Sequence, residues 1–430
     1  MIFRKTILLA LILLLGKLLA AAPKDTVSVM VYNLLFYGHY TSFCRPDNNN
    51  IDNKDEYLRT IFDHTTPDLF AVNEMGPSAD LAARILNNVI NREGAPEYAH
   101  AEFTNTAGSN LVNMLFFNTE KFTLYDEAVI AGIVRDINLY SLYYNDPELD
   151  NGADTVFVHL VVAHLKAGSR VGDQQTREQE IKAVLSGLTG MDLSGSIVFM
   201  GDFNMNSSYE QAYQLLTYNP HENIRFYDPI DSPGVWFNNP EMALYHTQSP
   251  RTDYHDCFVS GGLDDRYDQI IVTSAVMDGT HGLRYLEDSY KTIGQDGHRF
   301  NKSLIDPPNQ SEPPEVIDAL YNMSDHLPVK LRMVVTDVET NVPLMQESTE
   351  NIYLVNVPGS PPGIILEGAA GMIRFEIYTA SGRYIKGWKS FSDGGLERHP
   401  IDTEHLTVGV YLIRVTGENM IPYSEKFIIY

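Results

Sequence analysis

The chain has 430 residues, of which 44% are apolar and 20% charged, and a formal net charge of −25. This composition is typical of a globular protein, and the length is sufficient for more than one domain. The negative charge disfavours non-specific binding to polyanions, so a substrate that carries phosphate would need a metal ion or a few clustered cations.

The first 22 residues have the pattern of a secretory signal peptide. Arg4 and Lys5 precede an apolar run over residues 6–15, and "KLLAAAP" supplies small residues for cleavage near residues 20–22. Lys17 interrupts the apolar stretch, which is too short to cross a bilayer. No cysteine lies near the cleavage site, which argues against a lipoprotein. We therefore expect an exported protein with no stable membrane span.

The chain contains two cysteines, Cys44 and Cys257. In an exported protein they could form one disulfide, and two unpaired buried thiols are an equal alternative. The sequence leaves both open.

From residue 26 onward, apolar strand-like runs alternate with helical patterns. The runs occupy residues 27–32, 113–118, 155–164, 196–200, 267–273 and 328–335, and helical spacing occurs around residues 81–90 and 181–188. Strands that are apolar on both faces, with helices between them, predict an α/β fold in which helices cover the sheets. We interpret the proline-rich residues 305–318 as a long loop of the same domain, which extends over residues 23–336.

A polar, acidic segment without a clear period follows at residues 337–350 and is interpreted as a linker. Beyond it, residues 351–430 contain only short alternating strands separated by turn residues, as in "MIRFEIY" and "GVYLIRVT". This pattern predicts a small C-terminal β-sandwich.

Polar residues recur directly after the apolar runs. In "FMGDFN", Asp202 and Asn204 would point the same way if the strand continued through them, although a solvated turn has the same composition. Turn or cap chemistry explains each such residue singly, but their recurrence indicates one shared site. The set is Asn33, Glu74, His164, Asp202, Asn204, Asp268, Asp325 and His326.

These groups suit a phosphoryl-transfer site with a hard cation. Mg²⁺ takes one or two carboxylates and keeps sites for water and phosphate oxygens, so Glu74 and Asp325 form the natural ligand pair, assisted by Asn33 or Asp202. Mn²⁺ and Ca²⁺ are alternative ions. A histidine held by a carboxylate can orient or deprotonate water, or stabilise developing charge, and Asp268 with His326 supplies that pair.

The ordered motifs "YNLL", "NEM", "HLKAG", "GDFN", "YDQIIV" and "SDHLPV" resemble the endonuclease/exonuclease/phosphatase superfamily, which includes pancreatic-type deoxyribonuclease. The resemblance covers residues 27–335 and implies a four-layer αββα sandwich with the site at one edge of two packed sheets. It implies that Glu74 binds metal with Asn33 and Asp325 near it, that Asp202 and Asn204 position water and phosphate, that Asp268 orients His326, and that His164 contacts the phosphate or protonates the leaving oxygen.

Two further cationic features are open to two interpretations each. Arg135 falls where relatives place an arginine that faces phosphate, or it is a surface arginine beside Asp136. Lys166, Arg170 and Arg177 follow His164 and either contact a backbone phosphate or belong to a solvated loop.

The C-terminal strands resemble the sorting domain of substrates of the type IX secretion system of Bacteroidetes. The motifs are "FEIYTASGRYI", "IDTEHLTVGVYLIRVT" and "SEKFIIY". The resemblance implies the secretion machinery as a partner, export through the outer membrane, and a secreted or cell-surface location. An accessory β-sandwich that binds sugar is the alternative.

Together these features predict a secreted, monomeric, Mg²⁺-dependent phosphodiesterase, and specifically a nuclease that hydrolyses extracellular nucleic acid. A sphingomyelinase-like phospholipid activity and a small phosphate ester are the alternative substrates. The acidic charge counts against nucleic acid, and the lack of an exposed aromatic hairpin counts against lipid. A non-enzymatic surface binding protein is a third possibility, but no residue of the predicted site is lost.

Overall fold

The computed structural model describes residues 23–94, 96–338, 352–380, 384–417, 420 and 423–430. The predicted signal peptide and all but the first two residues of the predicted linker lie outside these ranges, so both assignments and the domain boundaries stay predictions. Among the described residues, no helix is long and apolar enough to cross a membrane.

Two mixed sheets form the centre of the molecule. The first is seven-stranded, with the order β11-β13-β1-β2-β4-β3 and with β12 paired to β13, and the second is six-stranded, with the order β5-β6-β7-β8-β10-β9. The strands of the first sheet are β1 Asp25–Tyr37, β2 Leu69–Met75, β3 Tyr98–His100, β4 Val112–Asn118, β11 Leu283–Tyr285, β12 Lys291–Thr292 and β13 Val329–Val335. Those of the second are β5 Phe122–Gly132, β6 Asp136–Tyr144, β7 Phe157–His164, β8 Ile197–Asp202, β9 Phe226–Tyr227 and β10 Asp268–Thr273.

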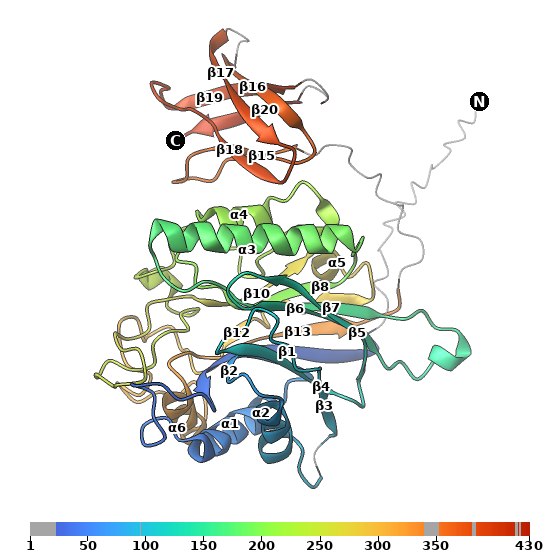
Figure 1. Cartoon of the computed structure of the whole chain (residues 1–430), viewed down its shortest axis with the longest axis vertical. Helices are drawn as coiled ribbons and strands as arrows, with labels where there is room; N and C mark the ends of the chain where they lie inside the picture. The colour runs from blue at the N-terminus through green and yellow to red at the C-terminus, as the bar shows by residue number, and fades with distance from the viewer. Residues whose placement is uncertain (1–22, 95, 339–351, 381–383, 418–419, 421–422) are drawn as a thin grey trace, which may run out of the picture.

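Helices cover the outer face of each sheet, so the molecule has four layers (Figure 1). On the first sheet lie α1 Ile51–Thr65, α2 Ala79–Arg84, which continues into a π-helix at Ile85–Ile90, and α6 Pro314–Met323. On the second lie α3 Val171–Gly190 and α4 Gln211–Thr217, with α5 Ser274–Asp278 after β10. Short 3₁₀ turns occur at Leu149–Asn151, Glu222–Ile224 and Pro240–Met242. The predicted αββα class is confirmed.

The first four residues of strand β8, residues 197–200, are all apolar because the strand lies between two cores. Val198 and Met200 belong to the core between the two sheets, whereas Ile197 and Phe199 belong to a second core beneath α3 and α4. Successive side chains of a strand point to opposite faces, so a strand between two cores has no solvent face and no alternation.

Two local expectations need correction. The predicted helix over residues 81–90 changes from α to π geometry at Ile85. The proline-rich loop is shorter than expected because α6 begins inside it, with Pro314 in the first turn, where the missing N–H of proline costs no hydrogen bond.

The C-terminal part is a small sandwich of two antiparallel sheets. One contains β14 Ile352–Val355, β15 Gly363–Leu366 and β18 Glu397–Pro400, and the other contains β16 Ala370–Thr379, β17 Tyr384–Asp393, β19 Gly409–Thr416 and β20 Tyr423–Ile429. Ile364, Phe375 and Ile413 are completely buried in its separate core.

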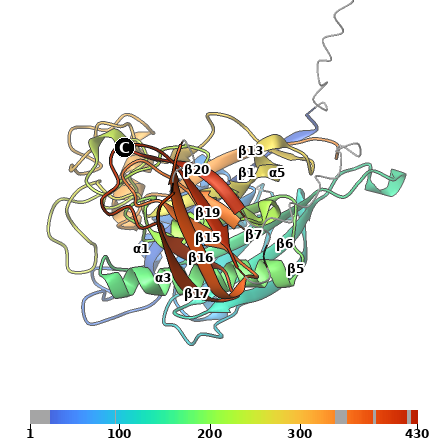
Figure 2. The same cartoon turned by 90° about the horizontal axis from the view of Figure 1, so that it is seen from above.

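This sandwich packs on the helical layer of α3 and α4, and it lies over α3 when viewed from above (Figures 1 and 2). Val355 and Ile365 are completely buried within the core of that layer. The Tyr209 hydroxyl donates to the Pro358 carbonyl at 2.9 Å, and His221 pairs with Glu367. The two parts of the chain therefore share apolar and polar contacts.

Candidate active site

The polar strand ends of both sheets meet at one edge. The register of the second sheet places Asp202 beside His164 of β7 on one side and beside Asp268 of β10 on the other. The first sheet contributes Asn33 from β1 and Glu74 from β2. The Asn33 amide Nδ2 donates to Asp202 Oδ2 at 3.0 Å and to Glu74 Oε1 at 3.1 Å, and it thereby joins the two sheets.

His326 and Asp268 form a buried pair. Nδ1 of His326 lies 2.6 Å from Oδ2 of Asp268. Burial alone would lower the pKa of His326, but the carboxylates of Asp268 and Asp202 raise that pKa well above its usual value. Ser324 fixes this segment, because its hydroxyl donates to the Asn33 carbonyl at 2.6 Å and accepts the His326 N–H at 3.1 Å.

Glu74 is held in a demanding conformation at the end of β2. Its φ of 58° lies in the left-handed region, which is unfavourable for a residue with a side chain. Its carboxylate accepts the Asn33 amide and also the Phe36 N–H at 3.1 Å. Burial, together with the nearby Asp325 carboxylate, raises the pKa of Glu74.

Asp202 lies at the centre of the cluster. Its Oδ2 is 3.5 Å from Nε2 of His164 and 3.8 Å from Nε2 of His326. Burial is the main reason that the pKa of the Asp202 carboxyl is raised to about 7, and the Asp268 carboxylate adds to it. A carboxyl group with such a pKa can accept a proton near neutral pH.

His164 is 2% exposed and also contacts Glu74, with 3.9 Å between Nε2 and Oε1. Burial, Arg135 and His326 all lower its pKa, so the imidazole is neutral at pH 7. Its Nδ1 is buried without a hydrogen-bond partner among the described residues.

Asn204 reaches the cluster by a different route from the one expected. Strand β8 ends at Asp202, and Asn204 has a φ of 52°, so the extended geometry does not persist. The turn instead returns the Asn204 N–H to Oδ1 of Asp202 at 3.0 Å. Gly201 allows the preceding backbone to approach β7, since a Cβ there would lie 1.7 Å from the Ala163 carbonyl oxygen.

The Arg135 side chain contacts the cluster and not the carboxylate of its sequence neighbour Asp136. Its guanidinium donates to the His164 carbonyl at 3.3 Å, while the Asp136 carboxylate accepts the N–H groups of Thr106 and Ala107. This geometry favours the interpretation that Arg135 faces the site.

The predicted cationic patch is only partly available to a ligand. Arg177 is completely buried, and its guanidinium donates to Glu210 at 2.7 Å and to the Lys166 and Gly168 carbonyls at 2.7 and 2.8 Å, so it holds the loop after β7 in place instead of facing solvent. Lys166 pairs with Asp173 at 3.0 Å. Neither interpretation made from the sequence anticipated the buried Arg177.

The donor set fits a divalent cation. In two groups of residues, one ligand atom of each member lies within 4.8 Å of a ligand atom of every other member. The first group is Glu74, His164 and Asp202, and the second is Asp202, Asp268 and His326. Oδ1 of Asp325 is buried and has no partner among the described residues. Clustered carboxylates with spare oxygens are the ligands that Mg²⁺ prefers. The Asn33 oxygen is occupied by the Leu35 N–H at 3.0 Å, so Asn33 orients the carboxylates in this arrangement.

The sequence did not single out three residues that support this cluster. Gln248 places its side-chain amide 2.7 Å from Nε2 of His326, and Asn73 accepts the Asp202 N–H at 3.0 Å. The buried Lys54 donates to the carbonyls of Leu34 and Leu35, and burial lowers its pKa to about 7. Asn73 adjoins Glu74 in a buried strand, and this position could have identified it from the sequence. No local sequence pattern indicates a role for Gln248.

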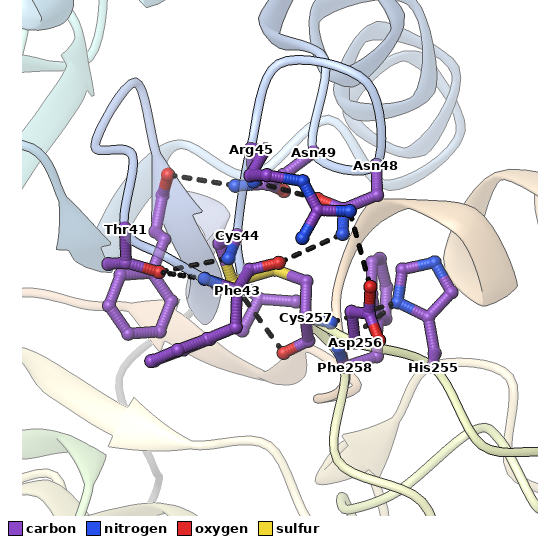
Figure 3. Close-up of a disulfide and its surroundings, with 12 residues drawn as sticks. Thr41, Phe43, Cys44, Arg45, Asn48, Asn49, His255, Asp256, Cys257 and Phe258 are labelled. Atoms are coloured by element: carbon purple, nitrogen blue, oxygen red, sulfur yellow. Dashed lines mark hydrogen bonds and ion pairs between the residues drawn. A yellow bond between two sulfur atoms is a disulfide. The ribbon is translucent and has the colours of Figure 1, made fainter.

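A disulfide joins Cys44 to Cys257, which resolves the alternatives left open by the sequence (Figure 3). Cys44 lies in the loop after β1, and the Phe36 N–H near the end of that strand donates to Glu74. Cys257 precedes Val259, whose N–H donates to Asp325 Oδ2 at 3.1 Å. The bridge therefore connects the loop after β1, the strand that contacts Glu74, to a segment that contacts Asp325.

Comparison with protein families finds one match in the chain, at residues 364–430, to the secretion system C-terminal sorting domain. The C-terminal sandwich carries a sorting domain. Such a domain directs type IX export, so the chain is a substrate of that machinery and reaches the cell surface or the medium. A comparison with curated protein sequences finds no match.

Solved structures that resemble this chain include those of TDP2, of an endonuclease/exonuclease/phosphatase and of Nocturnin. TDP2 of D. rerio complexed with single strand DNA product is 12% identical, with a TM-score of 0.45, over 72% of this chain and 99% of its own. The endonuclease/exonuclease/phosphatase from Bacteroides vulgatus is 15% identical, with a TM-score of 0.44, over 73% and 100%. The human Nocturnin catalytic domain with bound sulfate is 13% identical, with a TM-score of 0.44, over 74% and 96%.

Proposed function

We propose that this protein is an exported, Mg²⁺-dependent phosphodiesterase of the endonuclease/exonuclease/phosphatase superfamily that cleaves extracellular nucleic acid as a monomer. The observation that carries the proposal is the contact of Asn33 with both Glu74 and Asp202, beside the buried pair of His326 and Asp268. Carboxylates, an amide and two imidazoles gathered at one sheet edge suit hydrolysis of a phosphate ester better than they suit a binding surface.

Each residue has a distinct role in the proposed reaction. A divalent cation bound by Glu74 and Asp325 would neutralise charge on the phosphoryl oxygens and so lower the barrier. Asp202, whose pKa is about 7, accepts a proton from the attacking water. Asp268 keeps His326 charged and oriented, so that Nε2 can donate to a phosphoryl oxygen.

The remaining groups complete the proton balance. The water oxygen forms a bond to phosphorus as the bond from phosphorus to the leaving oxygen breaks. The leaving oxygen takes a proton from the charged His326, and the neutral His164 contacts the phosphate. Asn204 and Arg135 position the phosphate, since each has N–H groups near the cluster.

A substrate panel tests this proposal. Purified protein is assayed on single-stranded and duplex DNA, RNA, sphingomyelin vesicles and methyl p-nitrophenyl phosphate, with Mg²⁺, Mn²⁺ or Ca²⁺ and then with EDTA. We expect cleavage of nucleic acid that EDTA abolishes. Preference for sphingomyelin would replace the substrate class, and no turnover of any phosphodiester would refute the enzymatic proposal.

A further inference from the structure

A small cavity of about 230 Å³ lies beside the catalytic cluster. One wall contains Asn49, which precedes α1, and Asn53 and Tyr57 of that helix. The other wall contains Arg251 and Phe258. The Cys44–Cys257 disulfide joins the two wall segments, and Figure 3 shows Asn49 and Phe258 on either side of it. We call this cavity the asparagine pocket.

The asparagine pocket shares both walls with the catalytic cluster. Lys54, which lines the pocket, donates to the Leu34 carbonyl at 2.6 Å, one residue beyond Asn33. Phe258 is followed by Val259, whose N–H binds Asp325. A ligand in the pocket therefore lies next to the strand ends where a phosphate would react.

Two buried polar atoms of opposite character belong to residues that line the pocket. Oδ1 of Asn49 is an acceptor and Nε of Arg251 is a donor, and neither has a hydrogen-bond partner among the described residues. Asn49 is only 3% exposed. Buried polar atoms are nearly always paired, so the acceptor of Asn49 and the donor of Arg251 suit a ligand that both donates and accepts.

The flat walls and the size limit the ligand further. Cζ of Arg251 lies 4.7 Å from the Phe258 ring centroid and 3.9 Å from that of Tyr321, and these contacts fix the orientation of the planar guanidinium. Pockets for drug-sized ligands have volumes of about 300–1,000 Å³. The asparagine pocket is smaller, which suits a single planar ring system with polar edges.

We propose that the asparagine pocket binds one unpaired nucleobase, whose neighbouring phosphate then lies at the catalytic cluster. Proteins recognise single strands by hydrogen bonds to base edges and by aromatic or guanidinium planes. This mode does not need a long basic groove, which agrees with the net charge of −25. The inference rests on the proposed function and narrows its substrate to single-stranded nucleic acid.

The test compares oligonucleotides with and without a base. A short single strand is made with an abasic residue at each position in turn, and KM and kcat are measured for the wild type and for Arg251→Met, which keeps the apolar stem and removes the donors. We expect one position beside the cleaved bond at which loss of the base raises the wild-type KM about tenfold. Arg251→Met should raise KM similarly for the complete strand, leave kcat within about twofold, and have no further effect on that abasic strand.

Controls separate this inference from the proposed function. Arg284→Met removes an exposed arginine from a separate cavity of about 810 Å³ and should leave KM unchanged. Equal KM values for complete and abasic strands, or an Arg251→Met variant with an unaltered KM, would overturn the base site while the enzyme remains a nuclease. If wild type cleaves no phosphodiester, the proposed function fails. Binding of the same strands, followed by fluorescence anisotropy in EDTA, then decides the base site.

Discussion

The side-chain amide of Asn33 joins the two sheets, because its Nδ2 donates both to Asp202 Oδ2 at 3.0 Å and to Glu74 Oε1 at 3.1 Å. One carboxylate comes from each sheet. This neutral donor lies between two acids and, together with the Asp202 N–H that donates to Asn73 of β2, it links the two sheets at the candidate site.

Replacing this donor should damage activity more than stability. Asn33→Asp is nearly isosteric but adds a third carboxylate between two others, so we expect kcat/KM to fall about 10²-fold or more. Asn118→Asp, at another buried position on β4, is the matched control for a buried amide. An active Asn33→Asp with normal metal dependence would contradict the bridging role.

His326 and Asp268 should behave as one unit. His326→Ala and Asp268→Asn should each lower kcat about 10²–10⁴-fold, and the double variant should lose little more than the worse single variant. Steady-state kinetics and circular dichroism of all three variants check this. Losses that multiply would mean that the two residues act independently.

Glu74→Gln should weaken metal binding. The substitution removes one negative charge from the proposed ligand set, so the Mg²⁺ concentration for half-maximal activity should rise at least about tenfold. Calorimetric titration with Mg²⁺ gives an independent measurement. Glu241→Gln, an exposed surface change, is the control, and an unchanged titration in Glu74→Gln would remove Glu74 from the ligand set.

Folding stability should fall between about pH 4.5 and pH 7 because of Glu180. Burial raises the pKa of this carboxyl from 4.5 to about 7 in the folded protein, so the folded state binds the proton more tightly than the unfolded state does. The contribution of this difference to the free energy of unfolding is complete below pH 4.5 and is lost as pH rises through 7. The loss corresponds to about 3 kcal/mol. Glu180→Gln keeps an acceptor for the Lys166 N–H and should remove this part of the pH dependence in urea unfolding at pH 5 and pH 8. If the free energy of unfolding changed equally between pH 5 and pH 8 in the wild type and in Glu180→Gln, Glu180 would not be the source of this pH dependence.

Removing the sorting domain should separate export from catalysis. A chain ending at Thr336 should keep kcat but stay inside the cell. It should also melt at a lower temperature, because Val355 and Ile365 no longer cover the core at α3 and α4. Cell fractionation and thermal melting measure the two effects. Normal export of the shortened protein would contradict the sorting role.

The sequence alone determined the α/β class, the sorting domain and the candidate site residues. These follow from local patterns: residues 197–200 of β8 are all apolar because both faces of the strand are buried, and Glu74, Asp202 and His326 lie in motifs of a recognisable kind.

Only the tertiary structure decided how those residues act together. Asn33 turns its nitrogen toward the carboxylates, Asn204 leaves the strand direction, and Arg177 binds Glu210 inside the protein. The pairing of Cys44 with Cys257 joins positions separated by 213 residues. Periodicity reports which face of an element is buried, but it contains no information about which distant element covers that face. Contacts across the chain, and the side-chain orientations that they impose, therefore required the folded molecule.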